Sequence, residues 1–107
     1  MILWADPERI AAAVRDYAEA LRERHAGVTA IYWYGSWVSG RATPSSDVDL
    51  CVVVASDDRR YRDRLPDYLP ENFPVGMDLI VLTEAEMRGL PERAPSWHRA
   101  IVSGERV

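Results

Sequence analysis

The sequence predicts a single small α/β domain, residues 1–107, in which helices flank a three-stranded mixed sheet. Helical and strand-like segments alternate along the chain, which is typical of helices packed on a small sheet. The chain has 107 residues, of which 48% are hydrophobic, enough to form one core. Charged residues make up 28%, as in an ordinary globular protein. No segment has the composition of a linker, so we expect one domain.

The first helix is predicted to begin at Asp6-Pro7, because the carboxylate can cap the helix and proline suits its first position. Gly27 is well placed to end this helix. Between them, apolar residues recur at helical spacing, namely Ile10, Val14, Tyr17 and Leu21. Residues 28–34 are β-branched and aromatic, which predicts the first strand.

Two further strands are predicted at residues 47–54 and 76–82, where apolar residues predominate. Between them, residues from 57 to about 65 form a polar, arginine-rich segment. We interpret it as a helix with a solvated face that carries i,i+4 ion pairs such as Asp58–Arg62. A role in binding a partner is the less favoured interpretation, since charge runs on helices are usually surface.

The last part of the chain is predicted to form two helices. Thr83 and Glu86 have the spacing of a capping box, which starts the first of them. Trp97 and Ile101 share one face of the second helix, and Gly104 ends it.

The connections predict how the strands pair. The turn after the first strand is short, so the first two strands should be antiparallel neighbours. The second and third strands are joined by about 20 residues, which is the length of a parallel crossover. The end of the first strand and the starts of the other two should therefore meet at one edge of the sheet. Gly35-Ser36, Asp47, Asp49 and Asp78 all converge there.

Three carboxylates at this edge predict a metal site. Asp47 and Asp49 are two residues apart on a strand, so their side chains point to the same face, while Val48 and Leu50 point to the other. Asp78 lies near the start of another strand. Like charges held this close repel one another unless a cation lies between them. Magnesium suits this role, because it takes carboxylate oxygens together with water and phosphate oxygens.

A phosphate-binding turn is predicted beside the acids. Gly35-Ser36 opens a turn whose backbone N–H groups can face an anion, with a small hydroxyl beside them. Two magnesium ions held by carboxylates can orient an attacking hydroxyl and stabilise a leaving pyrophosphate. A phosphate-binding turn next to a carboxylate cluster implies a nucleoside triphosphate with its metals.

The stretch from Gly35 to Leu50 resembles the signature of the polymerase-β-like nucleotidyltransferase superfamily. That signature is a Gly-Ser pair, ten residues and then Asp-x-Asp, and the spacing to Asp47-Val48-Asp49 fits it. In length and in the order of its elements, nearly the whole chain resembles the minimal nucleotidyltransferases. The resemblance implies a polymerase-β-like nucleotidyltransferase fold.

The resemblance also implies a role for each motif residue. Asp47 and Asp49 would hold two magnesium ions, and Asp78 would hold one of them and help to take the proton from the acceptor hydroxyl. Gly35 and Ser36 would bind the β- and γ-phosphates. We also expect Arg41, the loop's one cation, and Ser46 to contact the nucleotide; the residues of this expected site are Gly35, Ser36, Arg41, Ser46, Asp47, Asp49 and Asp78.

A biological role follows from the same resemblance. Many minimal nucleotidyltransferases pair with a HEPN-domain ribonuclease toxin and act as its antitoxin by adding AMP, taken from ATP, to a hydroxyl of the toxin. The resemblance therefore implies a protein adenylyltransferase. The alternative is a non-catalytic binding module that neutralises a partner by covering it. That alternative is favoured by Trp37 and Ser39, which stand where many relatives carry a basic residue.

Composition excludes other classes of function. The net charge of −4 argues against unaided binding to long nucleic acid, which usually requires a basic face. No stretch approaches the roughly 20 apolar residues of a membrane span. Asp6 interrupts the apolar start too early for a signal peptide, and Cys51 is the only cysteine. We therefore expect a cytoplasmic protein.

Two residues keep a structural and a functional interpretation open. Trp37 could stack on a base or fill a groove of a partner, and burial against the first helix is equally compatible with its position. His25 is predicted to lie at the end of the first helix, where its charge would favour the negative helix pole over a catalytic role.

Overall fold

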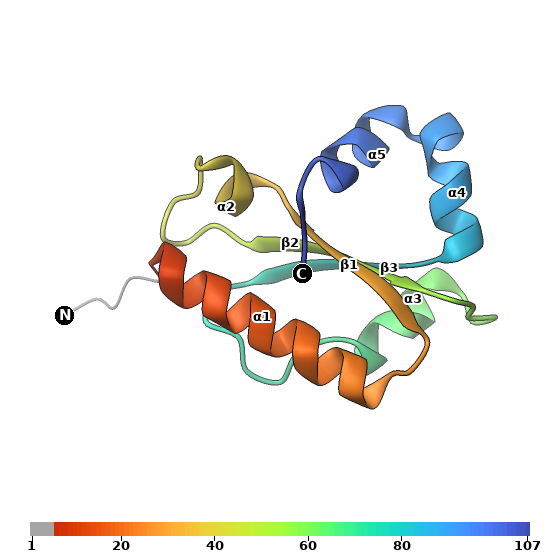
Figure 1. The fold of residues 1–107 in the computed structure, drawn as a ribbon, viewed down its shortest axis with the longest axis horizontal. Helices are drawn as coiled ribbons and strands as arrows, with labels where there is room; N and C mark the ends of the chain where they lie inside the picture. Colours follow the sequence, from red (N-terminus) through yellow and green to blue (C-terminus); the bar gives the residue numbers. More distant parts are fainter. Residues whose placement is uncertain (1–5) are drawn as a thin grey trace.

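In the computed structural model, which describes residues 6–107, the chain forms three layers (Figure 1). Helix α1 (Pro7–Arg24) lies on one face of the sheet, and helices α4 (Glu84–Arg93) and α5 (Pro95–Val102) lie on the other. The predicted α/β class is confirmed. No helix within this described part is long and apolar enough to cross a membrane.

The sheet has the strand order β3-β2-β1-β4. Strand β1 (Val28–Tyr34) pairs antiparallel with β2 (Val48–Val54), and β2 pairs parallel with β3 (Met77–Thr83), as predicted. The prediction of three strands was wrong by one, because β4 (Glu105–Arg106) pairs antiparallel with β1. Two residues are too few to show an alternating pattern, so the sequence carries no signal for this strand.

Gly104 explains how the chain can pass from α5 into β4. A Cβ atom at this position would collide with the carbonyl oxygen of Trp33 and lie 2.9 Å from the Cβ of Tyr34. A residue with a side chain would therefore push the end of α5 away from β1. Glycine keeps α5 close to the end of β1, where the candidate site lies.

Alternate residues of β2 pack into two cores on opposite faces of the sheet. Val48 and Leu50 belong to the core that α1 covers. Cys51 belongs to the other core, together with Leu90 of α4 and Ile101 of α5. The prediction that Val48 and Leu50 face away from the aspartates is confirmed, because Asp49 alternates with them along the strand.

Both ends of α1 are defined by polar contacts. The Asp6 side chain accepts a hydrogen bond of 2.8 Å from the backbone N–H of Arg9, which confirms the predicted cap. At the other end, His25 is the capping residue, and its Nε2 lies 3.1 Å from the carbonyl oxygen of Asp67. The His25 ring also packs on Tyr68, with ring centroids 4.6 Å apart. It therefore links α1 to the connection between β2 and β3.

That connection is less helical than the sequence predicted. Helix α3 spans only Tyr61–Arg64, and the 3-10 helix η1 spans Leu65–Asp67. The expected i,i+4 pair Asp58–Arg62 does not form. The ion pairs found among residues 6–107 are Arg59–Asp57, Arg59–Asp67 and Arg64–Glu86.

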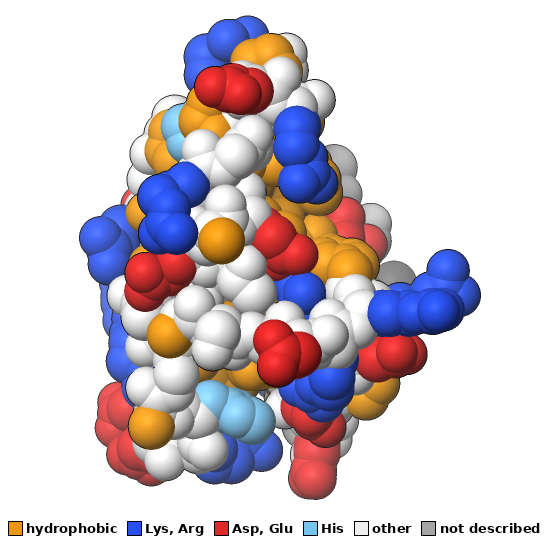
Figure 2. Space-filling view, turned by 90° about the vertical axis from the view of Figure 1, so that its right-hand side faces the viewer, with side chains coloured by type: hydrophobic (Ala, Val, Ile, Leu, Met, Phe, Trp, Pro, Cys, Tyr) orange, Lys and Arg blue, Asp and Glu red, His pale blue; other side chains and the backbone are white. Residues whose placement is uncertain are grey.

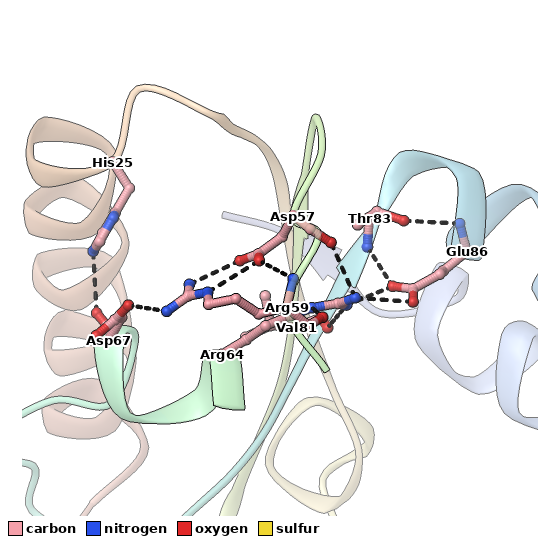
Figure 3. Close-up of polar contacts among 8 residues, drawn as sticks. All are labelled: His25, Asp57, Arg59, Arg64, Asp67, Val81, Thr83 and Glu86. Carbon is pink, nitrogen blue, oxygen red and sulfur yellow. Dashed lines mark hydrogen bonds and ion pairs between the residues drawn. The ribbon is translucent and has the colours of Figure 1, made fainter. Parts of the chain in front are cut away.

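The prediction of a solvated helix is also wrong at Arg64, which is only 4% exposed. Its guanidinium donates to both carboxylate oxygens of Glu86, at 2.6 and 3.2 Å (Figure 3). It also donates to the backbone carbonyls of Val81, Arg59 and Asp57. Tertiary contacts with β3 and α4 bury this arginine, and no local pattern predicts them.

The predicted capping box at the start of α4 is confirmed. The Thr83 hydroxyl accepts from the backbone N–H of Glu86, and the Glu86 carboxylate accepts from the backbone N–H of Thr83. Because the same carboxylate binds Arg64, the start of α4 is joined to α3 and to the end of β3 (Figure 3).

Candidate active site

The turn after β1 places Gly35 and Ser36 against the central strand of the sheet. Gly35 has a φ of +85° and a ψ of −157°, a conformation that is essentially restricted to glycine. A Cβ atom at Gly35 would also collide with the Asp49 carboxylate. Ser36 begins the short helix α2 (Ser36–Ser39), whose first backbone N–H groups have no partner within the helix. The turn and the carboxylate are therefore in direct contact.

The acids predicted from the sequence lie at one edge of the sheet. Asp49 of β2 is paired with Tyr34 of β1 on one side and with Asp78 of β3 on the other. Asp47 directly precedes β2, and its carboxylate lies against Gly76, where a Cβ atom would collide with it. Because Asp49 and Asp78 are aligned across two parallel strands, their side chains share one face of the sheet.

The electrostatics of Asp49 show that negative charge accumulates at this edge. Asp49 is half-buried, whereas Asp47 and Asp78 are exposed. Burial raises the pKa of Asp49, and the negative charges of Asp78 and Asp47 raise it further. None of the ion pairs found within residues 6–107 includes any of these three carboxylates. A cation bound between them would relieve this repulsion.

Tyr34 adds an aromatic hydroxyl to the same face. It is 9% exposed and belongs to the core under α4 and α5. Burial, the largest cause, raises its pKa to about 12; the Trp97 side chain at its hydroxyl opposes this rise, and the charges of Asp49 and Asp78 add to it. Tyr34 was not predicted as a site residue, because any aromatic residue of this strand could equally have packed in the core.

The loop between α2 and β2 is held by its own side chains. The indole N–H of Trp37 donates to the carbonyl oxygen of Ser46 at 2.9 Å, and its ring packs on the core that α1 covers. The structure therefore favours burial for Trp37. The hydroxyl of Ser46 accepts from the backbone N–H of Thr43 at 2.8 Å and lies 3.1 Å from the Thr43 hydroxyl. Trp37 and Ser46 therefore hold the loop that leads into Asp47.

A cavity of about 410 Å³ opens beside the Gly35-Ser36 turn. Its lining residues are Gly35, Ser36, Ser39, Arg41, Ala100 and Ser103. The structure therefore brings Arg41 together with Gly35 and Ser36, as the sequence predicted, and places Ser46 outside this lining. Ala100 and Ser103 belong to the α5 end of the chain, and sequence reasoning missed them. No local signal connects α5 with a turn that is some sixty positions earlier.

Comparison with known proteins shows the family of this chain. A family model described as a nucleotidyltransferase domain matches residues 14–102, which is most of the chain. The chain belongs to the nucleotidyltransferase domain family. Its fold is similar to the crystal structure of a proposed nucleotidyltransferase from Sulfolobus solfataricus, with a TM-score of 0.61 and 22% identity. That match covers 81% of this chain and 75% of the other. No curated protein matches the sequence.

Membership of this family indicates nucleotidyl transfer from a nucleoside triphosphate, and nucleotidyltransferase domains generally use divalent metal ions such as magnesium. The predicted fold is confirmed by the structural similarity, with four strands in the sheet where three were expected.

The donor groups at the sheet edge suit such an ion. Asp47, Asp49 and Asp78 offer only carboxylate oxygens, which hard cations prefer. Across residues 6–107, no three His, Cys, Asp or Glu side chains are already close enough to surround a metal ion. Magnesium is commonly held by one or two carboxylates, with water and substrate phosphates completing its shell. The carboxylates present therefore suit a magnesium ion whose other ligands are water and substrate phosphates.

Proposed function

We propose that this nucleotidyltransferase domain transfers AMP from ATP to a hydroxyl group of a partner protein. In this proposal, Asp47, Asp49 and Asp78 hold two magnesium ions, and Gly35 and Ser36 bind the triphosphate. The partner is a HEPN-domain ribonuclease toxin, and the domain acts as its antitoxin. One observation carries the catalytic part of the proposal: the Asp49 carboxylate lies directly against Gly35 and beside Asp78, so that the phosphate turn and the acids form one site.

The residues of this site have distinct roles in the proposed reaction. The backbone N–H groups at Gly35 and Ser36 hold the β- and γ-phosphates, and Arg41, which lines the same cavity, adds a positive charge. The acceptor oxygen forms a bond to the α-phosphorus while the bond from that phosphorus to the bridging oxygen of pyrophosphate breaks. Asp78 accepts the proton that the hydroxyl loses. Bound magnesium supplies charge neutralisation for the attacking and leaving oxygens.

The exposed side chains of the domain support a protein as the acceptor. Tyr61, Trp97 and Val102 are large apolar residues that are 37%, 41% and 42% exposed. Trp97 and Val102 both belong to α5, which covers the same face of the sheet that carries the acids. Exposed aromatic residues near a site are typical of surfaces that bind proteins. The choice of a HEPN toxin rests on the resemblance of the chain, in length and in the order of its elements, to the minimal nucleotidyltransferases.

The second candidate is a binding module that neutralises its partner without transferring a nucleotide. The loop after Gly35-Ser36 favours this candidate, because the Trp37 side chain donates a hydrogen bond to the backbone of Ser46 and supplies no positive charge for a triphosphate. Among the described residues that line the neighbouring cavity, Arg41 is the only cation. If the affinity for the triphosphate is low, binding of the partner is the main activity.

Co-expression with the protein encoded by the neighbouring gene separates these two candidates. We expect intact-protein mass spectrometry to show the addition of one or more AMP units on the partner, and tandem spectra to place them on a tyrosine, serine or threonine. Asp49→Asn should abolish the addition while the two proteins still co-purify. Neutralisation of the partner without added mass would overturn the transferase and support the binding module.

A further inference from the structure

A second cavity, of about 250 Å³, opens on the face of the sheet that carries the acids. Four elements surround it, namely α3, β3, α4 and α5, and its lining residues are Tyr61, Leu82, Glu86, Leu90, Arg93 and Trp97. Leu82 and Leu90 form its floor, since both are buried in the core under α4 and α5. The cavity is large enough for one bulky side chain of another molecule, and the proposed reaction does not use it.

Two exposed aromatic residues form walls of this cavity. Tyr61 is 37% exposed and Trp97 is 41% exposed, although burial would be favourable for rings of this size. The end of the molecule shown in Figure 2 carries charged side chains of both signs, with apolar side chains gathered in the space between them. Aromatic walls around an apolar floor are typical of a pocket that receives an anchoring side chain from a protein partner.

The aromatic walls lie on the same face of the sheet as the acids. Trp97 belongs to α5, which packs against β1, and Tyr34 at the end of β1 is paired with Asp49 across the sheet. Burial raises the pKa of Tyr61, and the negative charge of Asp78 is among the further causes. Leu82 and Asp78 are four residues apart on the same face of β3, a separation of about 13 Å at ~3.3 Å per residue. An extended peptide spans this separation with about four residues.

The charges around the cavity favour an acidic occupant. Arg93 lines it, and the ion pairs found among residues 6–107 do not include Arg93. The other charged lining residue is Glu86, whose carboxylate is already bound at both oxygens by Arg64. Arg93 therefore offers a positive charge beside an apolar pocket, and it complements a carboxylate next to an apolar side chain.

We propose that this cavity, which we call the anchor pocket, binds the acceptor protein next to the site of transfer. Its occupant is an aromatic side chain in an extended acceptor segment, about four residues from the hydroxyl that receives the nucleotide, with an acidic neighbour that faces Arg93. This inference rests on the proposed function, from which it takes a protein hydroxyl as the acceptor. The binding of the segment by the anchor pocket can nevertheless be measured without nucleotide.

Synthetic peptides test the proposal directly. Two peptides each carry a single tyrosine, with Phe-Asp four residues before it in one and four residues after it in the other. Each has a matched peptide in which Ala-Ser replaces Phe-Asp. Binding to the ¹⁵N-labelled domain is followed without nucleotide through the indole N–H signals. We expect one of the Phe-Asp peptides to bind about tenfold more tightly than its matched peptide and to shift the signal of Trp97, because anchoring aromatics dominate such interfaces.

Variants of the domain provide the matched controls. Trp97→Ala should remove the tenfold preference, whereas Leu69→Ala, which removes a similarly exposed apolar residue outside the anchor pocket, should leave it unchanged. Arg93→Glu should reverse the preference for an acidic neighbour, so that a Phe-Lys peptide binds better than Phe-Asp. Since Arg93 and Trp97 are exposed, both variants should fold.

Transfer of labelled AMP to the same peptides is measured separately. Equal binding of the Phe-Asp peptides and their matched peptides to the wild-type domain, or an unchanged preference in Trp97→Ala, would overturn the anchor pocket. Anchor-dependent binding without any transfer would support the pocket and count against the proposed function. Transfer that is indifferent to the anchor would support the proposed function and overturn the pocket.

Discussion

The two ends of β3 hold charged groups in opposite ways. At its start, Asp78 lies beside Asp49, and their charges meet no ion-pair partner within residues 6–107. At its other end, the buried Arg64 is bound by both oxygens of Glu86 and by three backbone carbonyls (Figure 3). The pKa of Asp49 is raised by burial and by its acidic neighbours, whereas hydrogen bonds from Arg64 lower the pKa of Glu86.

This difference separates a cluster of like charges from a contact that holds the fold. When a buried charged group is paired and hydrogen-bonded in the native state, removing its partner destabilises the fold, because a buried charge is left uncompensated. A cluster of like charges opposes folding until a cation binds, and such strain is characteristic of functional sites. We therefore expect changes at the two ends of β3 to have opposite effects on activity and stability.

The largest expected effect is on transfer in Asp49→Asn. The amide keeps the shape of the side chain and loses the charge that holds a hard cation, so transfer should fall by roughly a thousandfold or more. In EDTA, the variant should be as stable as the wild type or more stable, because the repulsion around Asp49 is removed.

Radiolabelled transfer assays and thermal melts in EDTA measure these two effects side by side. The wild type should also melt at a temperature several degrees higher with magnesium and ATP, and Asp49→Asn should not, because only ligand binding to the native state adds stability. A loss of about 1–3 kcal/mol in EDTA would instead identify Asp49 as a structural hydrogen-bonding group.

Arg64→Ala should have the largest effect on stability. The change leaves Glu86 without its main partner and exposes three backbone carbonyls that Arg64 satisfies, at an expected loss of about 3 kcal/mol. Arg62→Ala, on the exposed side of the same helix, is the control and should change stability by less than about 0.5 kcal/mol. Urea denaturation compares the two variants, and equal stabilities would show that the buried contact is dispensable.

Two glycines with similar positive φ values sharpen the comparison at the site, although their ψ values differ, −157° at Gly35 and 13° at Gly40. Gly35 and Gly40 have φ values of +85° and +80°, but an added Cβ atom meets the Asp49 carboxylate at Gly35 and open space at Gly40. Alanine at Gly40 should therefore cost only the backbone strain, about 1–2 kcal/mol. Alanine at Gly35 should cost more and should also abolish nucleotide binding, which isothermal calorimetry measures. Equal effects of both changes would contradict the contact between Gly35 and Asp49.

The smallest expected effect is the pH dependence of the Glu86 contact. Hydrogen bonds from Arg64 lower the pKa of Glu86 in the folded protein. The stability that ionised Glu86 contributes is therefore fully present above its unfolded pKa of about 4.3, and it is lost as the pH falls through the pKa of the folded protein. Glu86→Gln should be less stable than the wild type at pH 7, by about 1–2 kcal/mol, and the difference should shrink below pH 4. Glu84→Gln, which removes a neighbouring acid outside the ion pairs of the described residues, is the control for melts across this pH range.

Helices and strands were predictable wherever local chemistry decides them. Asp6 before Pro7 predicts the start of α1, and the Thr83–Glu86 spacing predicts the start of α4, because a cap depends on residues within one helical turn. The strand at 28–34 was predicted with its observed bounds. The strand predicted at 47–54 begins one residue before β2, and the strand predicted at 76–82 begins and ends one residue before β3. Chain direction and connection length were enough to bring Asp49 and Asp78 together, as the pairing of β2 with β3 confirms.

What the sequence by itself determined is the order of the main elements and the family motif from Gly35 to Asp49, since each depends on near neighbours in the chain. Only the tertiary structure decided that Arg64 is buried, that β4 completes the sheet and that Trp37 packs against the core. It also placed α5 beside the Gly35-Ser36 turn and built the cavity of the proposed anchor pocket from four elements. These features join residues that are distant in sequence, and the packing that joins them leaves no periodic pattern in the chain.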